Sequence, residues 1–299
     1  MKLIVRADDV GYTNVCNIGA FETMYNGVTT AADLMLDTPG AVDAMERLKE
    51  MPWISVGWHN HFWGSPVLDP SKVPTMYDPK TGHFRADLKF AEDVSYDECL
   101  AEMRAQMDRC VKVLGRAPDT ILSFGGTTPF SLATTKIIEE YGIISGFAYS
   151  KPFFFQEGED RGYHTPECYA ERKIYMLQPG ETTEKMVRTD SLEEHVTYNP
   201  LIDLFSGVLF AEIPDDATVV FVLHPGYVDH YVCREGDNGP GAPHYLIVRP
   251  IDSQALCSAE IKAWIRENKF ELCSFTDALH GTQKYQNHLR AIDSDLCML

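Results

Sequence analysis

The chain has 299 residues, a mass of 33.7 kDa and a formal net charge of −18 at pH 7. A field of that sign repels polyanions, which argues against a general nucleic-acid binder or a protein that coats anionic membranes. Hydrophobic residues make up 44% and charged residues 23%, as in ordinary globular proteins, and no apolar run reaches the roughly 18 residues of a membrane span.

A chain of about 300 residues is long enough for one α/β barrel, so we expect a single domain over residues 1–299. The N-terminal MKLIVRADDV lacks the long apolar region of a signal peptide, which predicts a cytoplasmic protein. Eight cysteines are scattered without a C-x-x-C pair, which predicts reduced thiols. We expect a small-molecule partner rather than nucleic acid or membrane, and the sequence leaves monomer, dimer and higher homo-oligomer open.

Short apolar or β-branched runs alternate with longer helical patterns along the chain. The predicted strands are residues 3–7, 30–36, 54–59, 120–124, 143–148, 174–177, 218–224 and 270–273. The predicted helices are residues 14–25, 41–49, 95–114, 132–141 and 253–268, the third opening on a capping box formed by Ser95 and Glu98. This order favours an α/β protein with a TIM-like (β/α) barrel, irregular in places, over a doubly wound sheet.

Two long connections, residues 62–92 and 225–251, are rich in Pro, Gly, Asp and aromatic side chains. Loops of this length in compact domains are often functional. Both follow predicted strands, so in a barrel they lie at the carboxyl-end face where active sites form. A third irregular stretch, residues 151–172, contains Phe153, Phe154 and Phe155 and is another candidate for a loop that covers the site.

Two adjacent acids, Asp8 and Asp9, follow the first predicted strand and precede a glycine turn at Gly11. At a strand end, one carboxylate can hold a metal ion while the other stays free as a base. The alternative is that one or both acids cap the helix that follows.

Histidines end two further predicted strands. His59 and His61 are two residues apart, so on a strand they share a face and can converge on one ion, although two packed histidines would give the same pattern. His224 ends the most apolar strand, just before Pro225, where an imidazole can act as a general acid or ligand or have a structural role. In a barrel, strand ends meet in one pocket, which favours the functional interpretation.

Three strings in this order, VRADDVGYTNVCN, VGWHNHFWGSPV and LHPGYVDHY, resemble motifs of the YdjC-like carbohydrate deacetylases. The later Arg249 and Asp252 resemble that family's R-x-x-E, and the resemblance extends over residues 2–279. It implies a (β/α)-barrel hydrolase that uses one divalent metal ion to remove acetyl groups from N-acetylated sugars such as chito-oligosaccharides.

By position, the resemblance makes Asp9 and His59 metal ligands, Asp8 the base that activates water, and His224 the group that protonates the leaving amine or orients the intermediate. Which adjacent acid is ligand and which is base stays open. The metal would polarise the amide carbonyl and lower the pKa of water towards about 7. Carboxylate and imidazole ligands leave its identity open among Zn, Mg, Mn, Co, Ni and Fe.

The chain departs from the family at residues 123–128, where the third metal ligand is expected and no histidine occurs. Our hypothesis is that His61 replaces this ligand. The alternatives are a hydrolase of a different amide or imide, and a catalytically silent sugar-binding or regulatory protein.

Four further residues are candidates for substrate binding. Trp58, Trp63 and Tyr227 flank the proposed site and could stack on a sugar ring, although aromatic side chains more often pack in a core. Arg249 could hold a substrate oxygen or pair with an acid such as Asp252.

Overall fold

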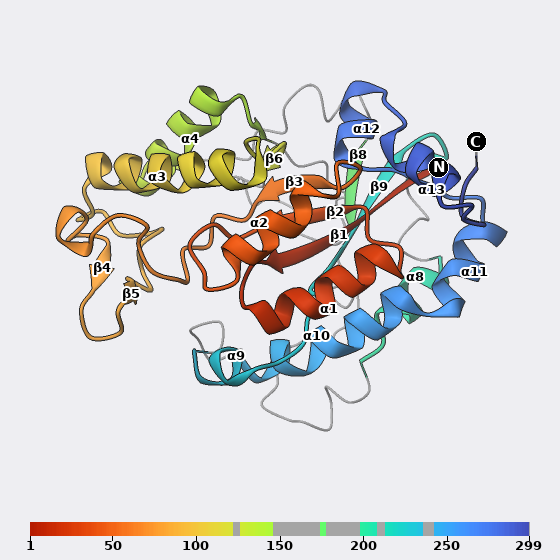
Figure 1. Cartoon of the computed structure of the whole chain (residues 1–299), viewed down its shortest axis with the longest axis horizontal. Helices are drawn as coiled ribbons and strands as arrows, with labels where there is room; N and C mark the ends of the chain where they lie inside the picture. The colour runs from red at the N-terminus through yellow and green to blue at the C-terminus, as the bar shows by residue number, and fades with distance from the viewer. Residues whose placement is uncertain (122–125, 146–173, 178–197, 208–212, 236–241, 299) are drawn as a thin grey trace.

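The computed structural model describes residues 1–121, 126–145, 174–177, 198–207, 213–235 and 242–298. Its strands are β1 (Lys2–Val10), β2 (Ala31–Leu34), β3 (Ser55–Trp58), β4 (Tyr77–Asp78), β5 (His83–Phe84), β6 (Thr120–Ile121), β7 (Ile144–Ser145), β8 (Ile174–Leu177), β9 (Thr218–Leu223) and β10 (Glu271–Leu272). All but the β4–β5 hairpin belong to one curled parallel sheet (Figure 1). The predicted α/β class is confirmed, and each of the eight predicted strands overlaps a strand of this sheet.

The strands lie in the order β7-β6-β3-β2-β1-β9-β8, which is the cyclic order of a barrel opened between β7 and β8. A doubly wound sheet would reverse its winding direction along the sheet. In a regular eight-stranded barrel the last strand separates β1 from β9. Here β10 has two residues and pairs only with Lys2 and Leu3, while β9 pairs directly with β1 from Lys2 to Ala7. The described strands therefore form a half-barrel.

Helices cover the sheet (Figure 1). They are α1 (Asn14–Tyr25), α2 (Ala41–Lys49), α3 (Tyr96–Leu114), α4 (Pro129–Tyr141), α8 (Pro200–Phe205), α9 (His230–Glu235), α10 (Ala242–Cys257), α11 (Ala259–Glu267), α12 (Phe275–His280) and α13 (Lys284–Ala291). The predicted bounds of α1 and α2 are confirmed. Within the described part of the chain, no helix combines the length and apolar character that crossing a bilayer requires.

Of the two hydrogen bonds in the capping box predicted at the start of α3, the structure confirms the one that Ser95 accepts, and the one assigned to the Glu98 carboxylate is wrong. The Ser95 hydroxyl accepts a hydrogen bond from the Glu98 amide, as expected. The Glu98 carboxylate, however, accepts from the amide and hydroxyl of Thr75, both at 2.8 Å, and the Ser95 amide donates to the Thr75 hydroxyl. Thr75 belongs to the long connection, so this tertiary contact replaces the local one.

The single helix predicted over residues 253–268 is wrong, because Ser258 separates α10 from α11 and caps α11 through the Ile261 amide. The loop predicted over residues 225–251 is also wrong, since it contains α9 and the first part of α10. Pro250, which argued for a loop, lies inside α10.

The other long connection, residues 62–92, is largely irregular, as predicted, apart from η1 (Pro70–Lys72) and the β4–β5 hairpin. Buried carboxylates hold its first part: Asp37 accepts from the Gly64 amide at 2.6 Å, and Glu102 accepts from the amides of Val67 and Leu68. Residues 123–125 and 151–172 lie outside the described residues. The six cysteines whose side chains are described are unpaired thiols, as predicted.

Helix α1 packs against the segment that follows β9. A Cβ placed on Gly19 would lie 2.6 Å from the Gly226 carbonyl carbon, whereas the nearest neighbours of a Cβ placed on Gly226 would be Cys16 atoms at 3.4–3.5 Å. This close approach holds the residues after His224 against the sheet edge.

We therefore predict that Gly19→Ala lowers the free energy of unfolding by about 1–3 kcal/mol, because backbone atoms must shift to admit the methyl group. Gly226→Ala, the matched control on the other side of the same contact, should stay within about 0.5 kcal/mol of wild type. Denaturant titration measures both. Equal stabilities for the two variants would contradict the predicted asymmetry of this contact.

Candidate active site

A β-bulge at the end of β1 brings both acids to the site. The pairing of β1 with β2 shifts register between Ala7 and Val10, and Asp9 has a left-handed φ of 58°. In a regular strand, Asp8 and Asp9 would point to opposite faces. Here a carboxylate oxygen of each lies within 4.8 Å of a His59 ring nitrogen, and both acids are buried.

The Asp9 carboxylate is shared by two cationic partners. His59 Nε2 lies 2.8 Å from Asp9 Oδ1, and Arg249 Nη2 donates to Asp9 Oδ2 at 2.8 Å. Arg249 has no exposed surface and lies over the Tyr12 ring at 5.3 Å. The acid that pairs with Arg249 in the structure is thus Asp9, across 240 positions of sequence, rather than the Asp252 suggested by sequence.

The other ring nitrogen of His59 contacts Asp33, a residue that the sequence analysis missed. Asp33 Oδ2 lies 2.9 Å from His59 Nδ1, and its strand β2 lies between β1 and β3. Opposite it, Gly57 leaves the necessary room, because a Cβ at Gly57 would lie 1.7 Å from Asp33 Oδ1. The sequence feature that could have identified Asp33 is its position as the one acid in the otherwise apolar stretch AADLML.

These contacts shift the pKa values of Asp9 and His59. Burial raises the pKa of Asp9, but Arg249 and His59 outweigh it and hold this pKa well below its ordinary value. Burial lowers the pKa of His59, but the carboxylates of Asp33 and Asp9 raise it to about 10. In the absence of a metal ion, His59 therefore carries a proton at neutral pH.

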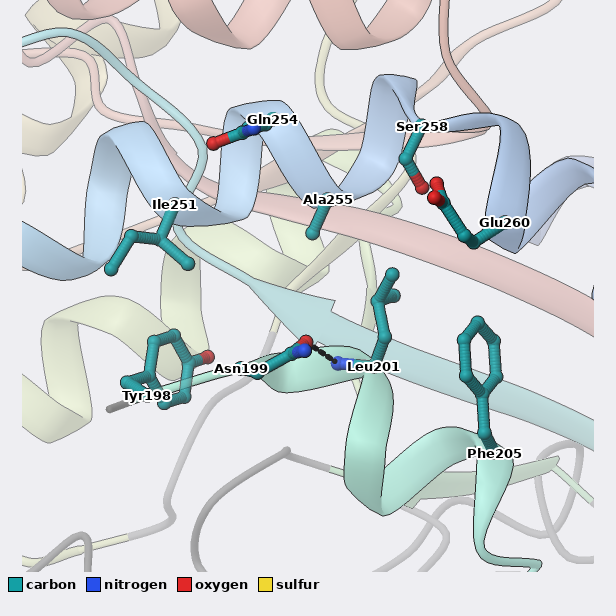
Figure 2. Close-up of a pocket in the computed structure, with 9 residues that line it drawn as sticks. All are labelled: Tyr198, Asn199, Leu201, Phe205, Ile251, Gln254, Ala255, Ser258 and Glu260. Carbon is teal, nitrogen blue, oxygen red and sulfur yellow. Dashed lines mark hydrogen bonds between the residues drawn. The ribbon is translucent and has the colours of Figure 1, made fainter. Parts of the chain in front are cut away.

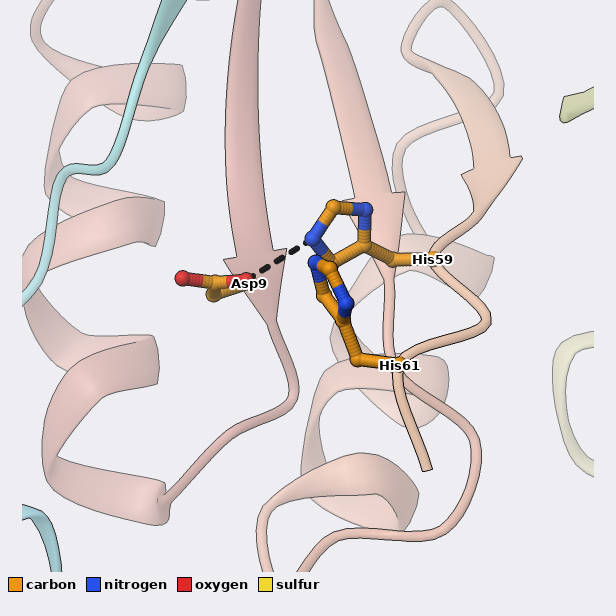
Figure 3. A group of neighbouring side chains, drawn as sticks. All are labelled: Asp9, His59 and His61. Atoms are coloured by element: carbon orange, nitrogen blue, oxygen red, sulfur yellow. Dashed lines mark ion pairs between the residues drawn. The ribbon is translucent and has the colours of Figure 1, made fainter. Parts of the chain in front are cut away.

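His61 lies beside His59, although not through strand geometry. β3 ends at Trp58, and the chain turns so that the His61 amide donates to the His59 carbonyl at 2.9 Å. The two rings meet edge to face at 4.0 Å, and Trp63 stacks on the other side of His61 at 4.3 Å. Figure 3 shows both imidazoles beyond the end of β3, facing Asp9 at the end of β1.

Lys89 also contacts His61. Its Nζ lies 3.1 Å from His61 Nδ1. Burial lowers the pKa of Lys89 to about 8, so it is mainly protonated at pH 7. Burial lowers the pKa of His61 well below its ordinary value, and the positive charges of His59 and Lys89 lower it further. His61 is therefore neutral.

Arg6 binds Asp8, the acid that precedes Asp9 in the sequence. Its guanidinium donates to both Asp8 oxygens at 2.6 Å and lies 3.6 Å from Asp33. A second potential metal-binding group, consisting of Asp8, Asp33 and His59, shares this region. Both Asp8 oxygens already accept from Arg6, whereas Asp9 Oδ1 faces His59 Nε2, so we favour the group formed by Asp9, His59 and His61.

His224 follows β9 directly and reaches the same strand edge. Its amide donates to Asp252 Oδ2 at 2.8 Å, and Tyr198 donates to the other oxygen at 3.0 Å. Burial lowers the pKa of His224, while the charges of Asp9 and Asp8 act to raise it. Asp252 thus anchors the backbone that carries His224.

The aromatic candidates lie in different surroundings. Trp58 is 1% exposed and belongs to the hydrophobic core, whereas Tyr227 is 40% exposed. Trp63 is half-buried and packs edge-on against Tyr12 at 5.8 Å. Trp63 and Tyr227 therefore retain surface for a ligand, whereas Trp58 packs in the core.

A separate pocket of about 440 Å³ lies between α8 and the helices α10 and α11 (Figure 2). Two of its polar lining residues, Asn199 and Ser258, already cap α8 and α11. Its Tyr198 donates to Asp252, whose other carboxylate oxygen accepts from the His224 amide.

The Asp9 and His59 atoms that face one another have the character of metal ligands. Asp9 Oδ1 and His59 Nε2 are buried, and neither makes a well-aligned hydrogen bond to any described residue. One ring nitrogen of His61, one ring nitrogen of His59 and one carboxylate oxygen of Asp9 lie within 4.8 Å of one another. Asp33 holds the far nitrogen of His59, as carboxylates commonly do behind metal-binding histidines. One carboxylate and two imidazoles are a donor set that fits a divalent metal ion.

The sequence profile of the YdjC-like protein family matches residues 2–267. The chain belongs to this family. The membership agrees with the motifs at Asp8, His59 and His224, which the fold brings to one edge of the sheet.

Several relatives of this YdjC-like protein match it over nearly their whole length. It is 28% identical over 279 residues to a carbohydrate deacetylase of Brevibacillus brevis, covering 93% of this chain and 99% of that one. It is 22% identical to a chitooligosaccharide deacetylase of Proteus mirabilis, covering 93% and 98%. The crystal structure of an Enterococcus faecalis protein, described provisionally as a cellobiose-phosphate cleavage protein, superposes with a TM-score of 0.63 at 24% identity, covering 93% and 98%. This last similarity supports the fold alone.

We predict that Asp33→Asn lowers the pKa of His59 from about 10 in the metal-free protein, because one of its two carboxylate partners loses its charge. A raised folded-state pKa contributes stability that is complete below the unfolded value of about 6.5 and is lost as pH rises through the folded value. The metal-free wild type should therefore lose stability from pH 6.5 towards pH 10, and the variant less so.

Histidine NMR titration in the presence of a chelator measures this pKa. His288, which stacks on Trp53 at 3.7 Å, provides an internal control whose pKa should not change. A wild-type His59 that titrates at its ordinary pKa would contradict the predicted effect of the two carboxylates.

Proposed function

We propose that this protein is a metal-dependent carbohydrate deacetylase that hydrolyses the acetamide of N-acetylated sugars, such as chito-oligosaccharides. The observation that carries the proposal is the buried Asp9–His59 pair, with facing ligand atoms 2.8 Å apart at the carboxyl edge of the sheet. The names of the full-length relatives support the substrate class. The proposed enzyme is a single-domain cytoplasmic protein with a small-molecule substrate, built on a TIM-like barrel.

Asp9, His59 and His61 would hold one divalent ion of Zn, Mg, Mn, Co, Ni or Fe. When bound, the ion supplies Lewis-acid polarisation of the amide carbonyl and a lowered water pKa. We propose Asp9 rather than Asp8 as the ligand, because Asp9 Oδ1 faces His59 Nε2 while both Asp8 oxygens face Arg6.

Asp8 would accept the proton of the attacking water. Arg6 fixes the position of its carboxylate, and each carboxylate oxygen keeps a further acceptor site beside the bond to Arg6. Because Asp8 and Asp9 are adjacent on the bulge, the base is held next to the ligand.

His224 would deliver a proton to the leaving amine nitrogen, which is a poor leaving group until it is protonated. A neutral imidazole holds one N–H to donate, and the contact of its backbone with Asp252 fixes where the residue lies.

We propose that Trp63 and Tyr227 contact the sugar, with Trp58 acting behind them from the core. Arg249, proposed from sequence as a substrate-binding residue, would act by positioning Asp9. Its buried guanidinium donates to Asp9 Oδ2, which keeps water from binding to that oxygen. Stacking aromatics and a fixed carboxylate together would orient the acetamide towards Asp8 and His224.

We predict near-stoichiometric metal in wild-type protein purified without chelators, and loss of that metal in both His59→Ala and His61→Ala, because each removes a donor. Elemental mass spectrometry measures the content. Metal that is lost only in His59→Ala would retain the site but contradict His61 as the third ligand, and no metal in wild type after soaking with Zn²⁺ or Mn²⁺ would favour the silent sugar-binding alternative.

We predict that wild-type protein releases acetate from N-acetylated chito-oligosaccharides and that His224→Ala lowers kcat by about 10²–10⁴-fold, because general acid catalysis contributes that much. His230→Ala, at an exposed histidine six positions later, is the matched control and should retain full activity. Circular dichroism checks that the variants fold.

Unchanged turnover in a folded His224→Ala would remove His224 from the mechanism. Oligosaccharide binding by metal-loaded wild type without acetate release would contradict the proposed reaction.

A further inference from the structure

Lys89 contacts His61, the third proposed metal ligand, and the sequence did not indicate this contact. Its Nζ lies 3.1 Å from His61 Nδ1, and its side chain is half-buried. The Thr128 hydroxyl donates to the Lys89 carbonyl at 3.0 Å, which fixes the backbone that carries it. Among the described residues, no carboxylate forms an ion pair with Lys89, although Asp37 and Asp9 act on its charge through space.

The chemistry of this contact has a strict consequence. A lysine ammonium is only a donor, so in this hydrogen bond His61 Nδ1 must accept. A neutral imidazole has one N–H, which must then be on Nε2. One nitrogen of His61 is thus occupied by Lys89 and the other by a proton, so neither offers a lone pair to a metal ion.

The charge of Lys89 acts in the same direction. An ammonium one imidazole away from a divalent cation repels it, and the repulsion is strongest in a buried site. The far nitrogen of His59 faces a carboxylate instead, because Asp33 can accept from His59 Nδ1. Arg249 donates to Asp9 Oδ2 and leaves Oδ1 facing His59. The three proposed ligands are therefore not equivalent.

We propose that Lys89 is a positioning residue that competes with the metal ion for His61 and so sets the metal affinity of the site. The ion gains its third ligand only when Lys89 no longer donates to His61 Nδ1, so that the imidazole proton can move from Nε2 to Nδ1 and free Nε2. The inference rests on the metal site of the proposed function.

Zn²⁺ affinity, measured by competition with a chromophoric chelator at pH 7, tests the proposal without any assay of activity. Lys89→Met, which removes both donor and charge, should bind Zn²⁺ at least about tenfold more tightly than wild type. Residues that hydrogen-bond to metal ligands typically change metal affinity by a factor of this size. Lys89→Gln, which keeps the polar character, provides a second uncharged variant, and Lys89→Arg should stay close to wild type. Lys80→Met removes the same charge from an exposed position of the same connection and should have no effect.

The same pair of measurements in a His61→Ala background separates competition for His61 from a general effect of charge. If Lys89 acts through His61, most of the gain from Lys89→Met should disappear there.

Three results would overturn the proposal. An equal gain with and without His61 would show that Lys89 does not act through it. Unchanged or weaker Zn²⁺ binding in folded Lys89→Met and Lys89→Gln would show that Lys89 does not compete, while leaving the metal site intact. No Zn²⁺ binding by any variant, wild type included, would remove the metal site together with this inference.

Discussion

The shared Asp9 carboxylate is the interaction on which the rest of the site depends. Arg249 holds one of its oxygens and His59 faces the other, and all three side chains lie within the protein. Around it, three buried carboxylates, those of Asp8, Asp9 and Asp33, meet two guanidinium groups, those of Arg6 and Arg249. One negative charge remains, and buried charge is costly unless it is compensated. Without metal, a proton on His59 supplies the balance, and a divalent ion would supply it on displacing that proton.

The fold concentrates these groups because of its strand order. β2, β1 and β9 are neighbours in a parallel sheet, and β3 lies next to β2, so the residues at their carboxyl ends share one edge. The bulge at Asp9 then brings the second of two adjacent acids to that edge. The close contact of Gly19 with Gly226 holds the segment after His224 in place from the other side. The β-bulge at Asp9 and the contact of α1 with Gly226 thus bring polar side chains together at this edge of the sheet.

Much of this could be predicted from the sequence, because alternating apolar runs mark parallel strands and polar residues directly after them mark the functional edge. Asp8, Asp9, His59 and His224 were selected as candidates in this way, and the strand order places them at one edge of the sheet. Asp33 was missed because an acid within an apolar run has no local partner in sequence, and its partners Arg6 and His59 become evident only from strand order. The turn that brings His61 beside His59, the position of Lys89 and the pairing of Arg249 with Asp9 depend on tertiary contacts. The helix through Pro250 was missed for a different reason, because proline and glycine content indicated a loop.

The most direct measurement is an anomalous difference map from crystals of the wild-type protein soaked in Zn²⁺. We predict one strong peak within about 2.0–2.2 Å of both Asp9 Oδ1 and His59 Nε2, the usual length of bonds from zinc to carboxylate and imidazole. A peak elsewhere, or an unoccupied site in which His59 stays paired with Asp9, would contradict the assignment of this pair as a metal centre.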